Sequence, residues 1–165
     1  GEVLISKTKV NAEDLAGMYN MADVTINISD AEGFGLATLE SLSCGTPIIA
    51  TMTGGLQEQV MGPEGENGVP LYPSSKSIIG SQQVPYIYED RISKKSFFSA
   101  LDKMYFGGEQ HRKELGDRGR RHVLQNYNFE TFNSRWVDLM DSLYEKNGSW
   151  GTRRNYSSIT FKEVA

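Results

Sequence analysis

Two glutamates flank a glycine-rich turn in the first quarter of the chain. Glu32 and Glu40 are separated by seven residues, and Gly33 and Gly35 lie between them. Glycine permits a positive φ and lets the backbone approach a ligand closely. A helix that begins near Gly35 would present unpaired N–H groups and the positive end of its dipole, which suits a phosphate. Carboxylates accept strong hydrogen bonds from hydroxyls, so the arrangement indicates a site able to hold both sugars of a sugar nucleotide.

Strand-like segments lie on both sides of this turn. In residues 24–28, apolar and polar side chains alternate and most are β-branched, which predicts a strand. Residues 47–51 form a short apolar run, which also predicts a strand. Between them we expect a helix that ends at Gly45. The inward-facing residues of this helix are expected to be Leu36, Leu39 and Leu42.

Two loops follow these strands, over residues 29–35 and residues 52–55, and Asp30 is expected to turn or cap the first loop. The alternation of β and α elements predicts an α/β fold with a Rossmann-like, right-handed parallel sheet flanked by helices. Ligands of such sheets bind beyond the carboxyl ends of the strands. Both loops are therefore expected at the binding edge.

The N-terminal segment shows one short strand pattern and one helical pattern. Residues 3–5 (Val-Leu-Ile) predict a strand or the end of one, and Asn11 is suited to cap a helix. The apolar face of that helix would carry Leu15, Met18, Tyr19 and Ala22. Asn67 and Gly68 indicate a turn before a further apolar run.

Helical patterns return after Ser93. The first of these helices has Phe97, Leu101, Met104 and Tyr105 on one face. A polar helix over about 109–126 carries His111 and His122, which we expect on its solvated side. The last helix has an apolar stripe that predicts core packing: Phe129, Phe132, Trp136, Leu139, Met140 and Leu143.

The segment over residues 72–92 is rich in Ser, Gly, Gln and Pro, and only Tyr86-Ile87-Tyr88 within it has the character of a strand. A functional loop and an insertion are both compatible with this composition.

The patterns along the chain divide it into a partial Rossmann-like domain that binds a sugar nucleotide (1–92), the C-terminal helices of the same domain (93–146) and a tail or strap (147–165).

Composition excludes several classes of protein. Lys and Arg total 17 and Asp and Glu total 21, and the net charge of −4 weighs against non-specific binding of nucleic acid. Cys44 is the only cysteine, which excludes an intramolecular disulfide and a cysteine-rich metal cluster. No apolar run approaches the length of a membrane span, and we expect a cytoplasmic protein.

The region around the two glutamates closely resembles the signature of retaining GT-B glycosyltransferases of the family 4 type. The resemblance rests on Glu32-x7-Glu40, on Gly-Phe-Gly-Leu between them, and on Ser-Leu-Ser-Cys-Gly-Thr-Pro-Ile-Ile-Ala directly after them. It extends upstream over residues 15–29 and downstream over residues 54–58, 67–69 and 127–130. The chain is similar to the C-terminal, donor-binding half of such enzymes.

The resemblance implies a role for each matched position. Glu32 would be catalytic and would hydrogen-bond hydroxyls of the donor sugar, and Glu40 would hold the nucleotide ribose. Gly33, Phe34 and Gly35 would lie against the sugar through the backbone, and the N–H groups of Leu36 and Ala37 would bind the diphosphate. Val10 would flank the base. The donor would be a UDP-, GDP- or ADP-sugar and the acceptor a glycan, protein or lipid, with no cofactor and, because no Asp-x-Asp occurs, no metal ion.

Members of this family also carry an Arg and a Lys on an earlier loop, which neutralise the departing diphosphate. That loop and the acceptor-binding N-terminal half are expected upstream of residue 1, because the chain starts without Met in strand-like residues. We expect residues 1–165 alone to be inactive. Two alternatives remain: another GT-B-shaped enzyme (a sugar phosphorylase or a sugar-nucleotide epimerase), or a non-catalytic interaction module. A phosphorylase would need a cofactor lysine, and no lysine occurs between Lys9 and Lys76.

Overall fold

The computed structural model describes residues 2–3 and 5–154. The chain divides into two compact units, of which the first ends at Gln125 and the second begins at Asn126. The predicted strand over 3–5 does not form at Val3 or Ile5, and Leu4 lies outside the described residues. The part of the expected tail beyond residue 154 also lies outside them.

A three-stranded parallel sheet forms the centre of the first unit. Its strands are β1 (Thr25–Asn27), β2 (Ile48–Thr51) and β5 (Gly68–Leu71), in the order β1-β2-β5. Thr25 lies opposite Ile48. The parallel pairing of the two predicted strands, with a helix crossing between them, is thereby confirmed.

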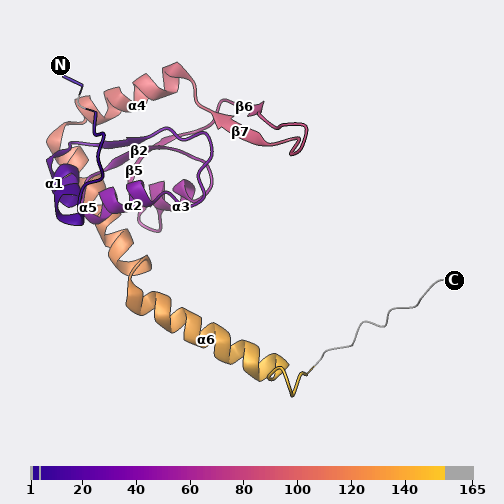
Figure 1. Ribbon diagram of the computed structural model, residues 1–165. Coiled ribbons are helices and arrows are strands. Elements are labelled where there is room, and N and C mark those ends of the chain that lie inside the picture. The colour runs from indigo at the N-terminus through magenta and orange to yellow at the C-terminus, as the bar shows by residue number, and fades with distance from the viewer. Residues whose placement is uncertain (1, 4, 155–165) are drawn as a thin grey trace. The chain divides into compact units, whose positions relative to one another are not determined.

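Helices cover both faces of this sheet, as Figure 1 shows, with α2 and α3 on one side and α4 on the other. Asn11 caps α1 as predicted, because its side chain accepts a hydrogen bond from the N–H of Asp14. Ser93 likewise caps α4 through the N–H of Ser96. The helices of the first unit are α1 (Ala12–Met21), α2 (Leu36–Ser43), α3 (Leu56–Val60), α4 (Lys94–Phe106) and α5 (Gly108–Asn126).

Two antiparallel hairpins complete the first unit. The small one pairs β3 (Met61–Gly62) with β4 (Gly65–Glu66), so the chain reverses there, before the turn expected at Asn67 and Gly68. The larger one pairs β6 (Ser75–Ile78) with β7 (Tyr88–Arg91) and gives the 72–92 segment a regular structure that its composition did not indicate. Only Tyr88 of the candidate strand Tyr86-Ile87-Tyr88 belongs to β7.

The face that α2 turns inward differs from the predicted leucine stripe. Leu42 is fully buried, but Leu36 is 67% exposed at the first turn of the helix. Thr38 and Ser41 are buried in its place. The inward face is partly polar because the Ser41 hydroxyl lies 2.8 Å from the Thr25 hydroxyl of β1 and 3.0 Å from the Thr46 carbonyl oxygen. Hydrogen-bonded hydroxyls are tolerated in a core that would reject unpaired ones.

The buried face of α5 is marked by glycines. A Cβ on Gly116 would lie 1.9 Å from the Gly45 carbonyl oxygen, and one on Gly119 would lie 2.4 Å from a methyl carbon of Leu42. This close approach also buries His122, whose Nε2 lies 3.0 Å from the Glu58 carbonyl oxygen. The expected solvated position of His122 is therefore wrong.

Over residues 126–154, which the structure describes, the second unit holds one helix, α6 (Phe129–Asn147), capped by Asn128. No residue of α6 is buried. The residues of its apolar stripe, which were predicted to pack in a core, are not buried: their exposed fractions range from 46% for Leu139 and Leu143 to 85% for Phe129. Tyr105 on α4, also expected to face inward, is exposed as well.

Candidate functional site

The two glycine loops meet at the carboxyl edge of the sheet, as the parallel topology requires. The N–H of Gly55 donates to the carbonyl of Gly33 at 3.2 Å. A Cβ on Gly54 would lie 1.7 Å from the carbonyl oxygen of Glu32, and Gly54 has a positive φ of 48°. Only glycine lets the second loop support the backbone of the first so closely.

Two polar side chains hold the start of α2. Gln59 of α3 is fully buried, and its Nε2 donates to the carbonyls of Phe34 (2.5 Å) and Gly35 (3.2 Å). The Thr38 hydroxyl lies 2.8 Å from the Gly35 carbonyl and 2.6 Å from Oε1 of Gln59. These contacts fix the backbone that leads into the helix, and Gly35 itself has a φ of 85°.

The first turn of α2 is open to a ligand. Gly35 is its N-cap, and among the described residues no side chain caps this helix end. Leu36 and Ala37 are both exposed. First-turn N–H groups have no partner within a helix, so this terminus can bind an anion.

The two predicted carboxylates come from the β1–α2 loop and from α2 itself. Glu32 is half-buried in the loop and Glu40 is exposed on α2. The Tyr19 hydroxyl of α1 donates to Oε2 of Glu40 at 3.1 Å. Burial, followed by this hydrogen bond and the charge of Glu40, raises the pKa of Tyr19 from 10.0 to about 12. The Tyr19 hydroxyl thus stays protonated to higher pH than an ordinary tyrosine and can orient the Glu40 carboxylate by this hydrogen bond.

Val10 directly precedes the Asn11 cap of α1 and is half-buried. The helix that follows it contacts α2, where the Tyr19 hydroxyl bonds Glu40.

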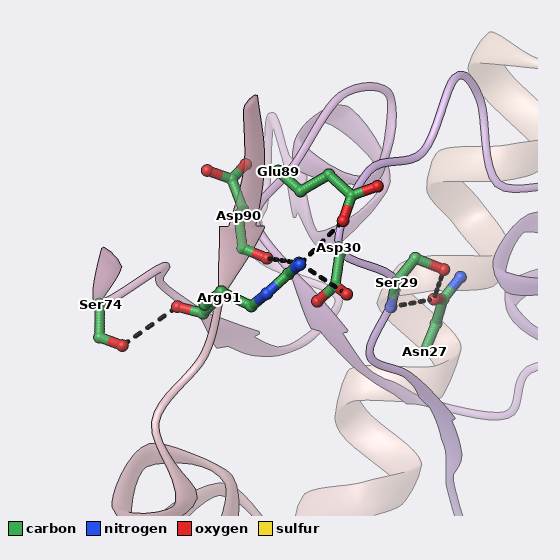
Figure 2. A network of polar contacts seen from close by, with 7 residues as sticks. All are labelled: Asn27, Ser29, Asp30, Ser74, Glu89, Asp90 and Arg91. Carbon is green, nitrogen blue, oxygen red and sulfur yellow. Dashed lines mark hydrogen bonds and ion pairs between the residues drawn. The ribbon is translucent and has the colours of Figure 1, made fainter. Parts of the chain in front are cut away.

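An ion pair holds the 29–35 loop near its N-terminal end. The Arg91 guanidinium lies 2.7 Å from Oδ2 of Asp30 and 2.9 Å from Oε2 of Glu89 (Figure 2). The hydrogen bond to Glu89, together with the charge of Asp30, raises the pKa of Arg91. Asp30 was expected to turn or cap the loop, and its carboxylate instead pairs with β7.

Sequence reasoning missed Tyr19, Gln59 and Arg91. The burial of Gln59 could have been predicted, because Gln59 shares the i, i+3, i+4 face of α3 with the apolar residues Leu56 and Val60, which are fully buried. The contacts of Tyr19 and Arg91 with the site join elements that are far apart in the sequence, so no local sequence pattern predicts them.

The arginines of α5 face partners within the first unit. Arg118 donates to the Glu66 carbonyl, Arg120 to the Ser43 carbonyl, and Arg121 pairs with Glu64. These contacts tie α5 to β4, to the end of α2 and to the β3–β4 turn.

A pocket of about 550 Å³ lies at the opposite edge of the sheet from the glycine loops. Asp23, Val24, Met104 and Arg112 are among its lining residues. None of the predicted donor-binding residues lines it. Within residues 2–3 and 5–154, no three or more His, Cys, Asp or Glu side chains gather as metal ligands, and no helix has the length and apolar character to cross a membrane.

Residues 3–97 match the family model of the glycosyl transferases group 1. This chain belongs to that family. A D-inositol 3-phosphate glycosyltransferase of Arthrobacter sp. (strain FB24) is 36% identical over 111 residues, which are 66% of this chain and 26% of the relative. An N-acetyl-alpha-D-glucosaminyl L-malate synthase of Bacillus anthracis is 26% identical over 62% of this chain and 26% of its own length.

Two solved structures agree with the fold. A sucrose-phosphate synthase of Thermosynechococcus elongatus superposes with a TM-score of 0.62 at 28% identity, over 83% of this chain and 29% of that one. The C-terminal domain of a group 1 glycosyl transferase of Francisella tularensis superposes with a TM-score of 0.52 over 75% of this chain and 53% of that one. At 22% identity, this similarity supports the fold alone. The parallel sheet flanked by helices is therefore that of GT-B glycosyltransferases. The chain spans about a quarter of the length of the curated relatives named above.

Proposed function

We propose that this chain is the donor-binding part of a glycosyltransferase. The enzyme would move a hexose from a nucleotide-diphosphate sugar to an acceptor and retain the configuration of the anomeric carbon. The observation that carries the proposal is the open start of α2 at the carboxyl edge of the sheet, with one carboxylate just before it and one on the helix. Family membership supports the reaction class.

The diphosphate would bind at the first turn of α2. The N–H groups of Leu36 and Ala37 would donate to it, supported by the helix dipole. These groups are held in place before the reaction by the contacts of Gln59 and Thr38 with the preceding backbone. Donors fixed in advance stabilise the charge that grows on the departing diphosphate without reorganising during the reaction.

The two glutamates would hold the two sugars of the donor. Glu40, oriented by Tyr19, would accept hydrogen bonds from the ribose hydroxyls. Glu32 would accept them from the transferred hexose, whose face would lie against the backbone of Gly33, Phe34 and Gly35. Val10 would flank the base.

The rest of the enzyme would complete the site. An acceptor-binding half would add basic groups near the diphosphate, as the family resemblance implies. The acceptor would be a glycan, protein or lipid. The donor would react without cofactor or metal ion, in the cytoplasm, where the single cysteine would remain reduced.

A ligand panel on the full-length protein tests the proposal. Thermal unfolding is measured with UDP-, GDP- and ADP-sugars, with the matching nucleotides, and with free hexose phosphates. One nucleotide series should raise the melting temperature, and Glu40→Ala should abolish most of that shift. Glu109→Ala, which removes an exposed carboxylate at the start of α5, is the matched control and should keep the shift.

Two results would count against donor binding. Absence of stabilisation by every nucleotide would favour an interaction module. Stabilisation by hexose phosphate alone would favour a phosphorylase-like enzyme.

A further inference from the structure

The β6–β7 hairpin contacts the 29–35 loop, which carries Glu32. The N–H of Asp90 donates to the Asp30 carbonyl at 2.8 Å, and Arg91 pairs with the Asp30 carboxylate at 2.7 Å. Figure 2 shows the Arg91 side chain directed at Asp30 from β7. We call these two contacts the Arg91 clamp.

The Arg91 guanidinium is itself held in place by its own strand. One nitrogen lies 2.9 Å from the Glu89 carboxylate, and Nη1 donates to the Asp90 carbonyl at 3.2 Å. The Arg91 carbonyl also accepts hydrogen bonds from the N–H and the hydroxyl of Ser74. A guanidinium with several fixed partners presents its remaining donor in one direction.

The clamp rests on a rigid element. β7 ends at Arg91, and Ser93 caps α4 two residues later. Ala100 and Met104 of α4 are buried in the core against the sheet. The position of Arg91 is thus set by the same core that positions β2 and β5.

Glu32 lies between two anchored points. Asp30 is held by the Arg91 clamp, and the Gly33 carbonyl is held by the N–H of Gly55. Ala31 and Glu32 are the only residues between them. Upstream, the side chain of Asn27 accepts hydrogen bonds from the N–H and hydroxyl of Ser29, which turns the chain toward the clamp.

We propose that Arg91 is a positioning residue for Glu32, and that the hairpin acts on donor binding by fixing the N-terminal end of the 29–35 loop. The inference rests on the proposed function, because it assigns to Glu32 a contact with the transferred sugar. Loss of the clamp should weaken the binding of a nucleotide sugar and leave the binding of the nucleotide alone unchanged. Glu40 and the start of α2, which would bind the nucleotide, do not depend on Asp30.

The size of the effect follows from the exposure of the pair. The Arg91 and Asp30 side chains are 33% and 47% exposed, so solvent screens their attraction. We expect Arg91→Ala to weaken nucleotide-sugar affinity about three- to fivefold, in the range set by partly exposed ion pairs. Arg91→Lys, which keeps the charge but not the fork of donors, should recover part of that loss.

The experiment combines calorimetric titration with hydrogen exchange on the full-length protein. Exchange is measured without nucleotide over residues 27–35 and 88–92 in Arg91→Ala and in Asp30→Asn, which keeps the size of the side chain. Both variants should exchange faster at these segments, and the double variant should add little to either. Lys76→Ala is the matched control, because Lys76 pairs with Asp90 on the same hairpin at 3.8 Å and is 67% exposed.

The outcomes separate this inference from the proposed function. Unchanged exchange in both variants, or equal losses for nucleotide and nucleotide sugar, would overturn the positioning role. If the unaltered protein binds no nucleotide sugar, the proposed function is wrong and the role of Arg91 falls with it. The exchange data would in that case still report the clamp as a structural contact.

Discussion

Replacing Gly54 with alanine tests whether the second glycine loop supports Glu32. The new Cβ would lie 1.7 Å from the Glu32 carbonyl oxygen, so the two backbones must separate by at least about 1.7 Å to reach ordinary van der Waals contact. Overpacking of this kind costs about 1–3 kcal/mol. Alanine at a φ of 48° costs roughly 1–2 kcal/mol more. We therefore expect Gly54→Ala to lower the free energy of unfolding by about 2–5 kcal/mol.

Urea denaturation of the full-length protein measures this loss, and Gly33→Ala provides the matched control. Gly33 lies in the supported loop, a Cβ added to it would meet no atom within 4 Å, and it does not have a left-handed φ. Its substitution should change the free energy of unfolding by less than about 0.5 kcal/mol. Equal stabilities of the two variants would refute the reasoning that the Gly54 backbone bears on Glu32.

Three further predictions concern the carboxylates, Tyr19 and α5. Glu40→Ala should weaken nucleotide and nucleotide sugar alike, whereas Glu32→Ala should weaken only the latter, each about tenfold or more by titration calorimetry. Because the folded-state pKa of Tyr19 is raised to about 12, its contribution to stability is complete below pH 10 and is lost as the pH rises through 12. Denaturation series between pH 10 and 12 should show this loss in the unaltered protein and a smaller loss in Tyr19→Phe. Gly116→Ala should destabilise by about 1–3 kcal/mol despite the better helix propensity of alanine, because the Cβ would meet the Gly45 carbonyl; an increase in melting temperature would contradict this packing argument.

The β1–α2–β2 unit could be predicted because its local signals agree with its tertiary setting. Two of the three residues of β1 are β-branched, glycines stand at both ends of α2, and β2 is mostly apolar and buried throughout. Each signal is local, and each matches the element it predicts. The site follows from this unit, since the loop after a parallel strand must lie at the carboxyl edge.

Errors arose where hydrogen bonds replace apolar contacts. Leu36 was placed inward because it is apolar, yet the buried face of α2 includes Thr38, which hydrogen-bonds Gln59. His122 was placed outward because α5 is polar, yet the glycines of α5 bring that face into contact with the core. Hydropathy ranks a residue by its own side chain and contains no information about the partner that satisfies it.

The pairing of Arg91 with Asp30 depends on geometry that no short window of sequence contains. Alternation along a strand places Glu89 and Arg91 on the same face of β7, so their contact is local. The contact with Asp30 requires in addition that β6 and β7 pair in the observed register, with Ser75 opposite Arg91. A slip of one residue would turn Arg91 to the other face of the hairpin and remove the ion pair. Substitutions in the 72–92 segment should therefore alter the 29–35 loop when they shift the register of the hairpin. Substitutions that change its composition and keep the register should alter that loop less.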